Sequence, residues 1–144
     1  MSQYQLTLND EHVQMLLRAL DVYSRIGCGQ LNRILELFLG DPRRRECSSI
    51  QREALFRFKQ QLLPLEGDAS YSICSPEVPV DYRLAWDVLQ VVRHHVAWEE
   101  QPAGGLFVQF DSPMNTSGAP FCTIETVDSD QAATNVPSVE GGNE

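Results

Sequence analysis

Along most of the first hundred residues, apolar side chains recur every three or four positions, which is the spacing of amphipathic helices. The pattern predicts four helices, over about 10–26, 30–39, 49–63 and 80–100. Asn9 is expected to cap the first helix, and Ser48 with Gln51 to form a capping box for the third. The apolar face of the third helix comprises Ile50, Ala54, Leu55, Phe58 and Leu62. The fourth helix is the longest and is expected to be central.

Three shorter segments are predicted to be strands instead. Tyr4, Leu6 and Leu8 alternate with polar residues, which predicts a short strand over residues 4–8 with one apolar face. Residues 106–110 and 121–127 are predicted to form two further strands. The expected fold class is therefore α+β, with about four helices packed against a small antiparallel sheet. In that arrangement the N-terminal and C-terminal strands pair with each other.

Composition divides the chain into two parts. Residues 1–127 read as a single globular domain, and residues 128–144 as an acidic, disordered tail rich in small polar side chains. The formal net charge is −9, and residues 101–144 contain six acids and no base. A protein that binds nucleic acid or an anionic membrane surface needs an excess of basic residues. We therefore expect neither partner.

The four cysteines, at positions 28, 47, 74 and 122, form no C-x-x-C pair and have no histidine at a metal-ligand spacing. This spacing favours reduced thiols and indicates no metal and no cofactor. The first residues lack the basic and apolar regions of a secretory signal. No apolar run is long enough to cross a bilayer. The expected location is the cytoplasm.

The junction between the first two helices is the main candidate site. Gly27 and Gly29 lie between Arg25 and Gln30, and a helix that begins after glycines offers free N–H groups to an anion. Arg25 could add a planar fork for phosphate or carboxylate. Alternatively, the segment is only a tight helical hairpin, in which Arg25 pairs with a carboxylate such as Asp21.

Aromatic and basic residues of the fourth helix could complete such a site. Trp86 with Arg93 could stack on a ring or base, although such residues more often belong to a core. The proposed ligand-binding set is Tyr23, Arg25, Gly27, Gly29, Gln30, Trp86 and Arg93. A second basic feature, Arg43-Arg44-Arg45, is either a handle for an acidic partner or a solvated turn.

Catalytic patterns are missing from the sequence. It contains no G-x-S-x-G, no S-x-x-K and no H-E-x-x-H, and the adjacent His94 and His95 point about 100° apart on a helix. We therefore expect no enzyme and no metal site. A small hydrolase using carboxylates and histidines is the least favoured alternative.

Several segments resemble an uncharacterised family of small hypothetical proteins of tailed bacteriophages and prophages. They are residues 19–31, which hold the run Tyr-Ser-Arg-Ile-Gly-Cys-Gly-Gln at 23–30, and residues 71–79, 85–98 and 110–113. The resemblance covers about residues 4–120. It implies a phage origin and a bacterial host cytoplasm, and no particular activity.

These observations lead to a principal hypothesis and an alternative. The first is a non-enzymatic phage accessory protein, with counter-defence as one candidate role, that sequesters an anionic, nucleotide-like host signal. Its pocket could be completed by a second subunit in a homo-oligomer. The alternative is a protein–protein inhibitor of a host defence or regulatory protein, docking through the acidic tail or an exposed helix face.

The first hypothesis predicts that Arg25→Ala abolishes binding of an anionic ligand, because the guanidinium is its proposed charge partner. Native mass spectrometry of protein purified from its host would detect a retained small molecule. Unchanged affinity in the Arg25→Ala variant would end this hypothesis.

Overall fold

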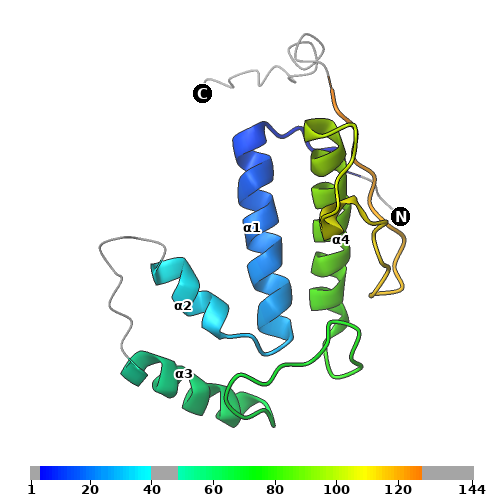
Figure 1. Cartoon of the computed structure of the whole chain (residues 1–144). Coiled ribbons are helices and arrows are strands. Elements are labelled where there is room, and N and C mark those ends of the chain that lie inside the picture. Colours follow the sequence, from blue (N-terminus) through cyan, green and yellow to red (C-terminus); the bar gives the residue numbers. More distant parts are fainter. Residues whose placement is uncertain (1–3, 40–48, 128–144) are drawn as a thin grey trace, which may run out of the picture.

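The computed structural model describes residues 4–39 and 49–127, and its regular elements are helical (Figure 1). The elements in chain order are α1 (Asp10–Gly27), α2 (Asn32–Leu39), α3 (Ser49–Leu62), α4 (Val80–Glu100) and the 3-10 turn η2 (Val108–Phe110). All four predicted helices are present close to their expected positions. No strand occurs in the described ranges, so the predicted α+β class is wrong.

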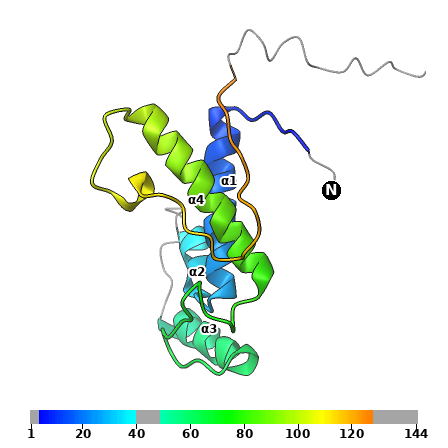
Figure 2. The same cartoon turned by 90° about the vertical axis from the view of Figure 1, so that its right-hand side faces the viewer.

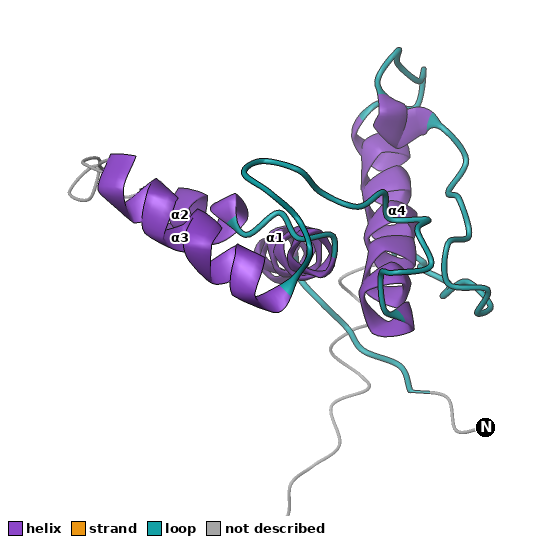
Figure 3. Cartoon of the chain, turned by 90° about the horizontal axis from the view of Figure 1, so that it is seen from below, coloured by secondary structure: helices purple, strands orange, loops and turns teal. Residues whose placement is uncertain are grey.

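Helices α1 and α4 form the body of the molecule. They run in opposite directions side by side, and Figure 2 shows that α4 is inclined to α1. Helices α2 and α3 contact each other and project to one side at the end where α1 finishes (Figure 3). The fold is thus a helix pair with a two-helix arm.

Local sequence explains where α1 begins. The Asn9 side chain accepts a hydrogen bond from the His12 N–H at 2.9 Å, which confirms the predicted cap. Asp10 and Glu11 place negative charge in the first turn, where it interacts favourably with the positive end of the helix dipole. The capping box predicted for α3 involves Ser48, which lies outside the described residues, as do Arg43-Arg44-Arg45 and residues 128–144.

Helix α4 is packed on two opposite faces. Ala85, Leu89 and Val92 are buried and lie on the same helical face as Tyr82, whose ring packs against α1. These are positions that the apolar periodicity predicts. The opposite face carries polar residues that all bond to one other segment of the chain. These residues are Arg83, Asp87, Gln90 and His94.

That segment, residues 109–117, runs back along α4 as a strap. Gln90 bonds both the N–H and the carbonyl of Met114, at 3.2 and 3.1 Å. Arg83 donates to the Thr116 carbonyl, and His94 Nδ1 lies 3.2 Å from the Gln109 carbonyl. Side chains of one helix face therefore satisfy backbone groups that a neighbouring strand would satisfy in a sheet.

Asp87 is the centre of this arrangement and is buried. Its carboxylate accepts four hydrogen bonds, from the N–H and hydroxyl groups of Thr116 and Ser117, at 2.6 to 2.9 Å. Burial raises the pKa of the Asp87 carboxyl, but these hydrogen bonds outweigh burial and hold the pKa below its ordinary value of 3.8.

The predicted strands do not form, because a local sequence pattern supplies no backbone partner. Residues 4–8 are extended, yet Tyr4 and Leu6 are exposed and their predicted partner strand is absent. Residues 106–110 form an irregular loop ending in η2, and residues 121–127 have no regular structure. Tyr4 and Leu6 thus lack the second layer that would bury one face of a strand.

Helix α3 is held by a buried lysine. The Lys59 ammonium donates to the carbonyls of Gly67 and Ala69, at 2.8 and 2.5 Å, and so fixes the loop after α3 against it. Burial lowers the Lys59 pKa, with Asp68 acting in the opposite direction. The expected apolar face of α3 is only partly buried, because Ile50, Phe58 and Leu62 remain exposed.

None of the helices in residues 4–39 and 49–127 combines the length and apolarity needed to span a bilayer.

We expect Asp87→Asn to lower the free energy of unfolding by about 2–3 kcal/mol at pH 7, because an amide leaves buried donors without an acceptor. The folded-state pKa of Asp87 is depressed, so its stabilisation is present above pH 3.8 and is lost as pH falls through the folded-state pKa. The difference between the two proteins should therefore shrink in acid. Urea unfolding followed by circular dichroism measures it.

Asp111→Asn is the matched control, since Asp111 is exposed in the same region. Equal stability of the Asp87 and Asp111 variants at pH 7 would contradict the role of Asp87.

Candidate functional site

The Arg25–Gln30 corner is a well-formed helix C-terminus. The Gln30 N–H bonds the Arg25 carbonyl and the Gly29 N–H bonds the Ile26 carbonyl, both at 2.9 Å. With Gly29 at φ +81°, these two bonds make a Schellman motif, in which glycine occupies the left-handed position. Gly29 is thus explained by chain reversal alone.

Gly27 serves a different purpose, which is close packing. A Cβ atom on Gly27 would lie 2.1 Å from Cγ of Tyr82, so only hydrogen fits between the end of α1 and the start of α4. The Tyr82 ring also stacks on Tyr23 with centroids 4.8 Å apart. The two glycines therefore have separate structural roles: Gly29 reverses the chain, and Gly27 allows the close contact with Tyr82.

The Arg25 guanidinium already has partners within the chain. Its Nε donates to Asp21 at 2.8 Å, and one terminal nitrogen donates to the Gln30 side-chain carbonyl at 3.0 Å. Gln30 in turn reaches Ser70 at 3.4 Å. The pairing of Arg25 with Asp21 is the one that the hairpin alternative requires. Anion binding at this corner stays a prediction, and the anion would compete with Asp21 and Gln30.

The loop after α3 closes the corner from outside. The Tyr71 N–H bonds the Cys28 carbonyl at 2.9 Å, and the Leu65 side chain lies against Gly29. Cys28 itself is buried. The N–H groups of Cys28, Gly29 and Gln30 and the Cys28 carbonyl are therefore occupied by the chain.

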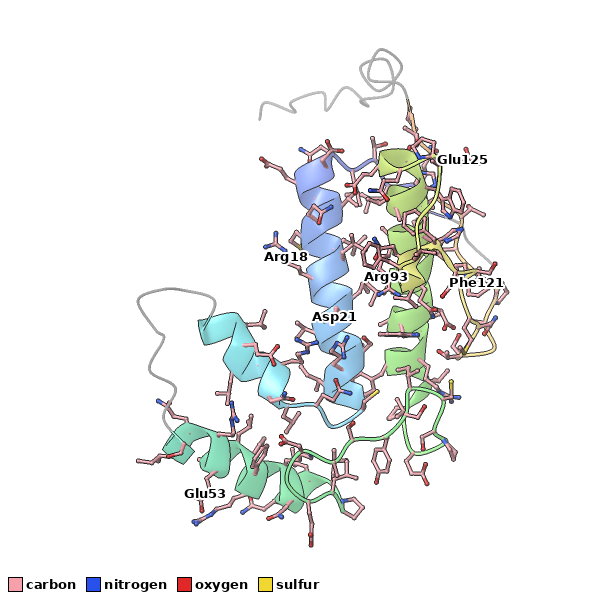
Figure 4. All side chains as sticks on the ribbon, in the orientation of Figure 1. Arg18, Asp21, Glu53, Arg93, Phe121 and Glu125 are labelled. Carbon is pink, nitrogen blue, oxygen red and sulfur yellow. The ribbon has the colours of Figure 1, made fainter. Side chains whose placement is uncertain are left out.

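Trp86 and Arg93 form a second group, on α4. The Arg93 guanidinium lies over the Trp86 ring, 5.9 Å from its centroid, and Figure 4 marks Arg93 near the middle of α4. Eleven residues separate Arg93 from Tyr82, which is about 16 Å along a helix. Arg93 thus lies away from the other predicted site residues of the corner, which are Tyr23, Arg25, Gly27, Gly29 and Gln30. Trp86 lies between them, one turn or about 6 Å along α4 from Tyr82.

A groove of about 360 Å³ adjoins the corner, between α2, α3 and the following loop. Its charged lining residues are Glu36, Arg52 and Asp68, with Gln30 and Ser70 among the polar ones. Among the described lining residues, two carboxylates and one guanidinium leave a negative balance. The groove therefore offers little electrostatic attraction for a phosphate.

A second, mainly apolar depression of about 500 Å³ lies between α4 and the last described residues. Its lining comprises Val91, His94, His95, Trp98, Pro113, Thr123, Ile124 and Glu125. Sequence reasoning missed it, because segments far apart in the chain build it. Both histidines already have hydrogen-bond partners within the chain. His94 contacts the Gln109 carbonyl, and His95 Nε2 lies 3.1 Å from the Thr126 hydroxyl.

Reactive groups are few in the part of the chain that the structure describes. Cys28, Cys74 and Cys122 carry free thiols, and burial raises the pKa of Cys28 despite the nearby Arg25. A raised pKa disfavours the nucleophilic thiolate. Across residues 4–39 and 49–127, no three histidine, cysteine or acidic side chains gather to hold a metal ion.

Three consecutive exposed apolar residues stand together on the loop after α4. Leu106 is fully exposed, and Phe107 and Val108 are 69% and 65% exposed; we call these three residues the apolar knob. The loop beneath them is packed, because Phe110 meets Trp98 edge-on with centroids 5.5 Å apart. The sequence signal for the apolar knob is its run of three consecutive apolar residues. The same run also fits the strand predicted for residues 106–110.

Two glycines let this loop lie close to its support. Gly104, at φ +78°, lies against the Trp98 ring, and a Cβ on Gly105 would lie 2.5 Å from the Phe110 ring. Trp98, Phe110 and the glycines thus form a base from which the apolar knob projects.

Comparison with protein-family models, curated proteins and solved structures gave no match for this chain. The resemblance to phage proteins and the cytoplasmic location therefore stay predictions.

We expect Gly27→Ala to destabilise the protein by about 1–3 kcal/mol, because the added methyl group overpacks the contact with Tyr82. Alanine otherwise favours a helix by about 1 kcal/mol over glycine, so the sign of the effect is diagnostic. The cost should fall when Tyr82→Ala is combined with it in a double-mutant cycle. A stabilised Gly27→Ala variant would contradict the close contact.

Proposed function

We propose that this protein is a non-enzymatic binding protein that recognises another protein through the apolar knob. The observation that supports the proposal is the exposure of Leu106, Phe107 and Val108 on a loop whose base is packed against α4. Clustered apolar side chains on a surface are typical of protein-interaction sites.

Order in the loop favours tight recognition. Binding costs less conformational entropy when the interacting side chains stand on a preformed support. The knob is supported at both ends: Gly104 rests on Trp98, and the Asp111 N–H bonds the Val108 carbonyl at 3.1 Å. Phe107 is the natural anchor, because large aromatic side chains dominate the energy of many interfaces.

Charge near the knob indicates what the partner should look like. Glu99, Glu100 and Asp111 flank it in sequence, and no lysine or arginine follows Arg93 anywhere in the chain. A complementary partner presents an apolar pocket with a basic rim. The acidic surroundings argue against insertion of the knob into an anionic membrane.

The other functional hypotheses receive less support from the same geometry. Arg25 is engaged by Asp21 and Gln30, and the adjoining groove has a negative balance, which weakens the case for sequestering an anion. The histidines and Cys28 are held in structural contacts or buried, which weakens the case for a hydrolase.

We expect the double variant Leu106→Ser/Phe107→Ser to lower affinity for the partner at least tenfold, because it removes the buried anchor of the interface. Crosslinking and affinity capture from a lysate of the cells in which the protein acts, with quantitative mass spectrometry, would identify proteins lost selectively. Capture should also weaken as salt is raised, since a basic rim is screened.

Tyr4→Ser is the matched control, because Tyr4 is also an exposed aromatic residue and lies far from the knob in sequence. Both variants should keep the circular dichroism spectrum and stability of the wild type. If the knob variant and the wild type capture the same proteins, the proposal fails.

A further inference from the structure

We propose that α3 binds α3 of a second copy of this chain, forming a symmetric antiparallel dimer. The contact surface is the apolar stripe, which we define as Ile50, Ala54, Phe58 and Leu62. This inference does not rest on the proposed function, because the stripe and the apolar knob belong to different elements.

The stripe is regular and exposed. Its four members are spaced by four residues, so they form one continuous ridge along α3. Ile50 is 74% exposed, Phe58 52% and Leu62 60%, and Ala54 is also exposed. A ridge of this kind is the feature that a globular helix normally buries.

Helix α3 cannot turn this ridge inward, because its other face is already fixed. Lys59, on the far side of the helix from Ile50, is buried and holds the carbonyls of Gly67 and Ala69. Leu55 and Phe56 are half-buried. Rotation of α3 would break the lysine contacts and leave two carbonyls without their donor. No segment within residues 4–39 and 49–127 therefore covers the stripe, and a partner chain could do so.

Charges beside the stripe identify a second copy as that partner. Glu53 and Arg57 lie on one flank of the stripe, one turn apart, and form an exposed ion pair at 2.6 Å. A two-fold axis that pairs the two α3 helices in opposite directions brings the same flank of each helix together. The residues along one flank then run in the opposite order to those along the other. Glu53 of each copy then meets Arg57 of the other, so the surface is complementary to itself.

Packing geometry agrees with this pairing. Ridges of residues four apart interdigitate most commonly at a crossing angle of about −50°. Ala54 is small and lies near the middle of the stripe, where two crossing helices approach most closely. Phe58 of one copy would then fill the space beside Ala54 of the other, which is the alternation of large and small side chains that good packing needs.

The first test is the mass of the full chain in solution across concentration. A stripe of four residues is a small interface, so we expect a reversible dimer with a dissociation constant of roughly 1–100 µM. Sedimentation equilibrium should show a mass that rises from one chain to two within that range. Phe58→Ser should weaken the dimer at least tenfold, while Met15→Ser, an equally exposed apolar position on α1, should leave it unchanged.

Charge exchange separates this arrangement from any other use of the stripe. Glu53→Arg and Arg57→Glu should each abolish the dimer, since each places like charges together. The two single variants mixed in equal amounts should associate again, and the double variant Glu53→Arg/Arg57→Glu should dimerise alone. In a parallel two-fold pairing this flank meets the opposite flank of the other copy, so positions 53 and 57 do not face each other. Recovery of the double variant is therefore expected only for the antiparallel pairing.

All four substituted positions are exposed, so circular dichroism should show folded proteins throughout. A chain that keeps the mass of one copy up to about 500 µM would overturn the proposal, as would a dimer insensitive to Phe58→Ser. Either result would show that the apolar stripe does not bind a second copy of this chain. Failure here would not affect capture through Leu106 and Phe107, so the two proposals can be judged separately.

Discussion

The buried carboxylate of Asp87 is the interaction on which the rest of the structure depends. Its four hydrogen bonds attach residues 116 and 117 to the middle of α4. A buried charge without such partners would be strongly unfavourable, so the strap and the carboxylate require each other. Because the strap returns from the end of α4, this attachment also limits the path of residues 101–115. It therefore positions the loop that carries the apolar knob.

Helix α4 works as a two-sided support. One face carries the small and branched residues that pack against α1, and the other carries polar side chains that hold an extended segment. This division accounts for a thin core, in which few large side chains are fully buried. It also explains why apolar residues remain available at the surface. They occur where neither α1 nor the strap covers the chain, at the apolar knob and along the apolar stripe.

The Arg25–Gln30 corner shows how one motif can support two interpretations. Its glycines, arginine and glutamine are all accounted for by a Schellman turn, a close contact with Tyr82 and an ion pair with Asp21. The same groups would suit an anion only if those contacts opened. Protein recognition needs no such rearrangement, because the apolar knob is already exposed on a packed base.

The sequence by itself determined the four helices, the cap at Asn9 and the buried positions of α4, since these follow from local periodicity and local hydrogen bonding. It also placed the Arg25–Asp21 pair among the alternatives, because residues four apart meet on a helix. Only the tertiary structure decided that residues 4–8, 106–110 and 121–127 are not strands, because a strand needs a partner that no local pattern supplies. The apolar knob, the strap held by Asp87 and the exposed stripe of α3 were decided in the same way. Each depends on which distant segment covers a given face. The apolar pattern of the sequence shows that a face should be buried, but it does not identify the segment that buries it.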